Sequence, residues 1–108
     1  MKISVVLPAK NEAGAIEQTV KNIQQLNLVN EILVVNDGST DYTAKLAEQA
    51  GARVISHPYS KGNGAAIKTG ARNALGEIII FMDADGQHDA NDIPRLLEKI
   101  DAGYDLVV

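Results

Sequence analysis

The sequence predicts an α/β fold of three layers, in which helices cover both faces of a mostly parallel β-sheet. Short β-rich runs alternate with longer amphipathic segments, which gives the order βαβαβαβαβ. One run, residues 78–82, consists of large apolar residues without alternation, as in strands that are covered on both faces. The right-handed crossover rule makes such strands parallel. The 108 residues suit a single domain, 1–108, and contain no linker or internal repeat.

The first half of the chain is expected to hold two strands and two helices. The first strand is predicted at residues 3–7 and ends at a proline, and the second is predicted at residues 32–35. Asn11 is a good N-cap for the helix between them. The buried face of that helix is predicted from one-face spacing to consist of Ile16, Val20, Ile23 and Leu26. Turn and cap residues follow the second strand, and an Ala-rich helix then runs to about Gly51.

The second half repeats this alternation. Strands are predicted at residues 53–56, 78–82 and 104–108, with a glycine-fronted helix from 62 to about 75. Small residues on that helix should allow close approach to the sheet, namely Ala65, Ala66, Gly70, Ala71 and Ala74. The last helix is predicted from the spacing of Ile93, Leu96, Leu97 and Ile100. Because the fifth strand would end with the chain, we expect a truncated part of a longer domain.

Composition narrows the classes of function. The net charge of −4 and the scattered Lys and Arg residues argue against a nucleic-acid partner. The absence of cysteine excludes disulfides and thiolate metal sites. No apolar run is long enough for a signal peptide or a membrane span, so we expect a cytoplasmic segment. An unfinished sheet would expose an edge, which favours a homo-oligomer.

An abrupt change from apolar to acidic residues marks the most informative site. The run 78–82 is followed by Asp83, Ala84 and Asp85. Side chains at positions i and i+2 of an extended segment share a face, so the two carboxylates should point the same way. They repel each other unless a cation lies between them, and Mg²⁺ or Mn²⁺ with substrate phosphate oxygens is the natural occupant. The alternative is a helix-capping loop.

Two further strand exits carry polar residues, and in a parallel sheet they reach the same edge as the acid pair. The first exit holds Pro8, Ala9 and Glu12, and the second holds Asp37 and Gly38. Asp37 is either a carboxylate that accepts a hydrogen bond from a nucleotide base or part of an ordinary Asp-Gly turn. Glu12 is either a pocket residue or only an acid that complements a helix dipole.

Four other residues have weaker signals. Lys61 reaches a phosphate or is a solvated loop lysine, because its glycine-rich neighbourhood fits neither the P-loop nor the dinucleotide spacing. Gln87 could add a neutral oxygen ligand to the metal or be a loop amide. His88 could be a ligand or a phosphate contact, but we interpret it as a solvent-facing loop histidine. His57 has no partner in view, so we interpret it as structural.

Together, four blocks of sequence closely resemble the family 2 glycosyltransferases of the GT-A fold, over essentially the whole chain. The blocks are residues 7–12, 35–41, 61–66 and 83–88. The branch that the chain is most similar to makes polyprenyl-phosphate sugars, like dolichyl-phosphate mannose synthase. The resemblance implies transfer of a sugar from a UDP- or GDP-linked donor to an acceptor, which could be a lipid phosphate, with inversion. It would place the parent protein at the cytoplasmic face of a membrane.

The resemblance also implies roles for individual residues. Asp83 and Asp85 match the Asp-x-Asp motif that binds a divalent metal on the donor diphosphate, and Gln87 matches a further metal contact. The nucleoside pocket is matched by Pro8, Ala9, Glu12 and Asp37. We also place Gly38, Lys61 and Ala84 among the nucleotide-binding residues. The acceptor side and the catalytic base would lie beyond residue 108, so the chain alone is expected to be inactive.

The chain departs from the family pattern at two positions, and two alternative functions remain open. Lys10 and Asn36 stand where many relatives have an aromatic residue and a second acid. A sugar-phosphate nucleotidyltransferase would also join an α/β sheet to metal-binding acids, but it would want a glycine-rich, basic segment after the first strand. A non-catalytic receiver-like or nucleotide-binding module would also place acids at strand ends.

Overall fold

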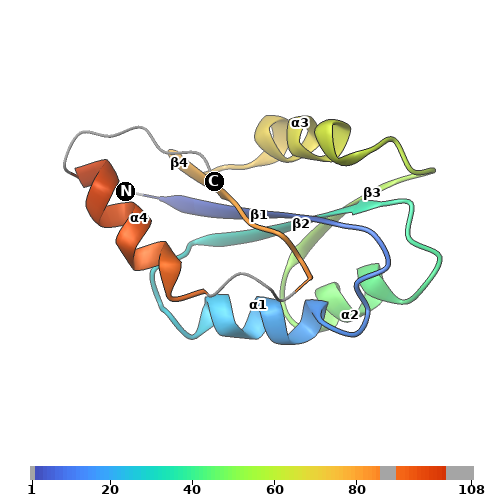
Figure 1. The fold of residues 1–108 in the computed structure, drawn as a ribbon, viewed down its shortest axis with the longest axis horizontal. Helices are drawn as coiled ribbons and strands as arrows, with labels where there is room; N and C mark the ends of the chain where they lie inside the picture. The colour runs from blue at the N-terminus through green and yellow to red at the C-terminus, as the bar shows by residue number, and fades with distance from the viewer. Residues whose placement is uncertain (1, 86–89, 102–108) are drawn as a thin grey trace.

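The computed structural model describes residues 2–85 and 90–101 and contains a parallel β-sheet in that part of the chain (Figure 1). The strands are β1 (Ile3–Ala9), β2 (Glu31–Asp37), β3 (Arg53–His57) and β4 (Ile78–Phe81). Their order across the sheet is β3-β2-β1-β4, and each neighbouring pair is parallel. The predicted α/β class with a parallel sheet is therefore confirmed. The predicted strand at 104–108 lies outside the described residues.

Helices cover both faces of the sheet, as the three-layer prediction requires. The helices are α1 (Ile16–Gln24), α2 (Thr43–Gln49), α3 (Asn63–Asn73) and α4 (Asp92–Asp101). Figure 1 shows α3 on one face, and α1, α2 and α4 on the other. Successive residues of β1 serve the two layers, because Val5 and Leu7 join the core beneath α1 whereas Val6 packs on the side of α3. β1 and β2 are buried along nearly their whole length, whereas the apolar run predicted as covered on both faces forms β4, of which only Ile80 is fully buried.

Two local predictions about the first strand and helix were wrong. β1 continues through Pro8 to Ala9, and β4 pairs with β1 only as far as Val6. The missing N–H of Pro8 therefore removes no bond from that ladder. Asn11 is not the cap of α1, which begins at Ile16. Its backbone is left-handed, with φ of 55°, and its side chain bonds a neighbouring loop instead.

The predicted close approach of the small-residue helix to the sheet is seen at two positions of α3. Ala66 is fully buried, and Gly70 lies against Val6 of β1. A Cβ atom added at Gly70 would lie 2.3 Å from Cγ1 of Val6, well inside van der Waals contact. Any larger residue at this position must displace either the Val6 side chain or the helix.

Gly70→Ala is therefore expected to destabilise the fold by about 2 kcal/mol. Overpacking a rigid core contact costs up to about 3 kcal/mol, and the helix propensity of alanine offsets about 1 kcal/mol of that. Urea unfolding measures the difference. Gly64→Ala is the matched control on the same helix, because nothing lies within 4 Å of its added Cβ. Equal unfolding free energies of the two variants would contradict the packing argument.

Candidate functional site

A pocket of about 430 Å³ opens at the carboxyl edge of the sheet, where the segments after β1, β2 and β4 meet the start of α3. Its lining consists of Pro8, Ala9, Lys10, Glu12, Asp37, Ser60, Gly62, Asn63, Ala66, Asp83, Ala84 and Asp85. The structure thus brings the polar strand exits together in one cavity. Open parallel sheets bind their ligands at this edge.

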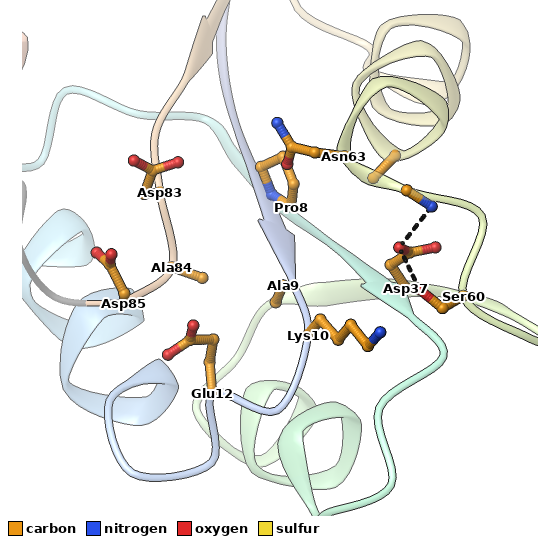
Figure 2. Close-up of a pocket in the computed structure, with 12 residues that line it drawn as sticks. Pro8, Ala9, Lys10, Glu12, Asp37, Ser60, Asn63, Asp83, Ala84 and Asp85 are labelled. Atoms are coloured by element: carbon orange, nitrogen blue, oxygen red, sulfur yellow. Dashed lines mark hydrogen bonds between the residues drawn. The ribbon is translucent and has the colours of Figure 1, made fainter.

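One side of the pocket is acidic. Asp83 and Asp85 follow β4, and Figure 2 shows their carboxylates on the same side of the pocket as that of Glu12. Burial raises the pKa of Glu12, and the charges of Asp85, Asp41 and Asp83 raise it further. Glu12 therefore lies within the field of the acid pair as well as being partly buried.

The donors on this side suit a hard divalent cation. Carboxylate oxygens are the protein ligands that Mg²⁺ and Mn²⁺ prefer, and Mg²⁺ is usually held by only one or two of them, with phosphate oxygens and water completing its shell. Asp83 and Asp85 supply such a pair, whereas no cluster of three or more ligating side chains occurs within residues 2–85 and 90–101. The residues therefore fit a metal that is shared with a phosphate ligand. Gln87 and His88 lie outside the described residues.

The opposite side of the pocket depends on Asp37, the last residue of β2. Its Oδ1 accepts hydrogen bonds from Nδ1 of His57 and from the backbone N–H of Lys61, each at 2.8 Å. Its Oδ2 accepts from the hydroxyl of Ser60 at 3.1 Å and from the N–H of Gly62 at 3.0 Å. Burial opposes ionisation of the carboxyl group, but these hydrogen bonds outweigh it and lower the pKa of Asp37 to about 2.

His57 was interpreted as structural because no partner was in view, and the structure supplies two. In the parallel register, His57 of β3 lies directly beside Asp37 of β2. The Nε2 atom of His57 contacts the hydroxyl of Thr69 on α3 at 2.8 Å. Only the register of β2 and β3 could have revealed the first contact from sequence, because twenty residues separate the pair.

The segment 39–43 fixes the loop that carries Glu12. The hydroxyls of Ser39 and Thr43 accept the backbone N–H groups of Asn11 and Glu12, both at 2.9 Å. Asp41 accepts the N–H of Ala13 at 3.1 Å and also bonds the hydroxyl of Thr43. The turn and cap residues after β2 therefore do more than start α2, because they hold Glu12 at the edge of the pocket.

Gly38 and Lys61 lie beside the pocket and are absent from its lining. Gly38 has φ of 70°, and a Cβ atom there would lie 2.4 Å from the backbone nitrogen of Ser60, so the two loops touch only because this residue is glycine. The ammonium group of Lys61 lies 5.4 Å from the ring centroid of Tyr59. Lys61 reaches the pocket through its backbone bond to Asp37.

Apart from Lys10, four lining residues were missed from the sequence, namely Ser60, Gly62, Asn63 and Ala66. They lie after β3 or at the start of α3, which covers the face of the sheet above the pocket. The glycine-rich segment 61–64 was the available signal, although it matched no known phosphate loop. Lys10, noted as a departure from relatives, supplies the positive charge of the lining and extends toward the side of Asp37 (Figure 2).

A parallel sheet with a pocket at its carboxyl edge, acidic on one side, is the arrangement of ligand-binding α/β proteins. The chain belongs to glycosyl transferase family 2, whose family model matches residues 4–108. It is 40% identical over 111 residues to an uncharacterised protein of Methanocaldococcus jannaschii, and the match covers 99% of this chain and 45% of that protein. It is 36% identical over 118 residues to undecaprenyl-phosphate 4-deoxy-4-formamido-L-arabinose transferase of Proteus mirabilis. That match covers 98% of this chain and 36% of the Proteus mirabilis protein.

Solved structures share the fold. Glucosyl-3-phosphoglycerate synthase from Mycobacterium tuberculosis in complex with UDP matches with a TM-score of 0.83 and 35% identity, over 94% of this chain and 40% of that one. The same enzyme in complex with Mn²⁺, UDP and glucosyl-3-phosphoglycerate matches with a TM-score of 0.80 and 34% identity, over 92% and 39%. The chain thus spans less than half the length of these relatives. Among the described residues, no helix has the length and apolar character to cross a membrane.

Proposed function

We propose that this chain is the donor-binding part of a metal-dependent glycosyltransferase that transfers a sugar, with inversion, from a UDP- or GDP-linked donor. The observation that carries the proposal is the single pocket that has Asp83 and Asp85 on one side and the Asp37-bonded loop on the other. Family membership supports it, as does the binding of UDP and Mn²⁺ by the glucosyl-3-phosphoglycerate synthase of similar structure.

The acidic side of the pocket would take the diphosphate. Asp83 and Asp85 would hold Mg²⁺ or Mn²⁺, and Gln87 is proposed as a further contact. Such an ion, when bound, stabilises the charge that develops on the departing nucleoside diphosphate. Ala84 is almost fully buried between the two acids and keeps their backbone against the sheet. Glu12 adds negative charge beside them, so the site disfavours an unaccompanied diphosphate and binds one with its metal.

The other side would take the nucleoside, over Pro8 and Ala9. Asp37 already accepts four hydrogen bonds, which is about the capacity of a carboxylate. A base that bonds Asp37 must therefore share an oxygen with the loop, and this contact remains a prediction. Gly38 and Lys61 do not line the pocket themselves. They are proposed to act indirectly, by fixing the position of that loop.

The acceptor would be bound by residues that lie outside this pocket. A polyprenyl phosphate is the proposed acceptor, because the related Proteus mirabilis protein is named as an undecaprenyl-phosphate transferase. Such an acceptor would place the parent protein at the cytoplasmic face of a membrane. Association of two copies through an open sheet edge is a further proposal.

Calorimetric titration of the full-length protein with UDP, GDP, UDP-glucose and GDP-mannose, each with and without Mn²⁺, tests this function. We expect one nucleotide series to bind in the presence of Mn²⁺ and to bind at least about 10-fold more weakly without it, because the acidic side repels a bare diphosphate. Failure of every nucleotide to bind in Mn²⁺ would refute the proposal.

A further inference from the structure

The pocket wall opposite the acid pair depends on a chain of three side chains that runs from the half-buried Thr69 of α3 through the buried His57 to the buried Asp37 of β2. The side chains of Asp37 and His57 are each only 7% exposed. His57 contacts Asp37 through Nδ1 and Thr69 through Nε2, each at 2.8 Å. Both ring nitrogens are therefore occupied, and the imidazole cannot turn over without breaking both contacts.

The chemistry of the partners fixes where the proton lies. An ionised carboxylate only accepts hydrogen bonds, so Nδ1 of His57 carries a proton and donates a hydrogen bond to Asp37. In the neutral ring Nε2 is then an acceptor, and it accepts the hydroxyl proton of Thr69. The direction of donation runs from Thr69 through His57 to Asp37.

Each remaining bond to Asp37 comes from the loop that forms the pocket wall. Ser60 and Gly62 line the pocket, and the N–H of Lys61 lies between them. This loop is exposed to solvent, and it leads directly into α3. The orientation of one carboxylate therefore determines where the wall lies, and His57 is the side chain that sets this orientation from the buried side.

We propose that His57 and Thr69 are positioning residues of the nucleotide pocket, which hold Asp37 in the orientation that fastens residues 60–62 as the pocket wall. The inference rests on the proposed function for its effect on nucleotide binding. Its effect on the loop stands without any ligand. The two parts can therefore be tested separately.

Limited trypsin cleavage after Lys61, in the full-length protein without nucleotide, tests the loop. His57→Ala removes one hydrogen bond to a charged group and is expected to raise the cleavage rate about 10-fold. His57→Asn places an amide donor where Nδ1 was and is expected to restore most of the protection. Thr69→Val should give a smaller increase, whereas Thr69→Ser should give none. Cleavage after Lys21 on α1 reports general unfolding and should not change.

Unchanged cleavage after Lys61 in both His57→Ala and Thr69→Val would overturn the proposal, as would equal increases after Lys21 and Lys61. If His57→Ala does not fold, the comparison of His57→Asn, Thr69→Val and Thr69→Ser decides. Nitrogen-15 NMR of the ring gives an independent signature, because a neutral His57 should be protonated at Nδ1. A neutral ring protonated at Nε2 would also overturn it.

Calorimetric titration with UDP and Mn²⁺ tests the effect on the pocket. His57→Ala is expected to weaken binding about 10-fold, as for loss of one hydrogen bond to a charged group, and His57→Asn to recover it. Loosening of the loop without any change in affinity for UDP would reduce His57 to a structural residue and overturn the positioning role. If the native protein binds no nucleotide in Mn²⁺, the proposed function fails, while the cleavage experiment still decides whether His57 holds the loop.

Discussion

Replacing Asp83 and Asp85 together by asparagine is expected to remove the Mn²⁺-dependent part of UDP binding, with a loss of about 100-fold in affinity. Both carboxylates line the pocket at the end of β4, and the substitution keeps their size while removing two charges. Neutral amides are poorer ligands for a hard cation. Without the ion, the diphosphate would face Glu12 alone, so the residual binding should be independent of Mn²⁺.

The matched control removes two carboxylates from elsewhere on the surface. Glu48 on α2 and Glu98 on α4 are exposed and lie outside the pocket lining. Glu48→Gln with Glu98→Gln makes the same change in net charge and should leave UDP affinity within about 2-fold, because solvent-exposed charges outside the pocket are screened by salt. An equal loss in both double variants would attribute the effect to net charge and contradict a local site. Retention of Mn²⁺ dependence in the Asp83 and Asp85 variant would contradict the assignment of the metal.

The sequence predicted the features that depend only on a single strand and on the residues that directly follow it. The apolar run of residues 78–82 predicted a strand directly before Asp83, and the parallel topology then placed the other strand exits at the same edge. All strands of a parallel sheet end at the same edge. The meeting of these residues can therefore be predicted without knowing any side-chain contact. This reasoning located both sides of the pocket.

Features that depend on contacts between distant segments were not predicted. Asn11 has the chemistry of a helix cap, but its left-handed backbone and its bond to Thr40 belong to the contact between two loops. His57 gained its role from the register of β3 against β2, and Thr69 gained its role from the position of α3. The sequence around Asn11 and around His57 gives the same local signal with or without these contacts, so long-range packing decided between the alternatives.

Asp37→Ala is expected to lower the free energy of unfolding by about 3 kcal/mol, because each buried donor left without its acceptor costs about 1–3 kcal/mol. Four donors lose their acceptor, and the Nδ1 proton of the buried His57 is the most costly to leave unpaired. Asp37→Asn keeps the size of the side chain and one acceptor oxygen, so it should lose less. Urea unfolding at pH 7 measures both variants, and a loss below about 1 kcal/mol for Asp37→Ala would contradict the network.

The acid limb of the stability curve checks the same carboxylate in the native protein. The pKa of Asp37 is lowered from its ordinary value of 3.8 to about 2 in the fold, so the folded state favours the ionised form. This contribution, about 2 kcal/mol, is fully present above pH 4 and is lost as the pH falls through about 2. Asp37→Asn cannot ionise and should lack this part of the acid destabilisation. Because each donor to Asp37 comes from His57 or the loop 60–62, its protonation should open the nucleotide side of the pocket before the sheet itself unfolds.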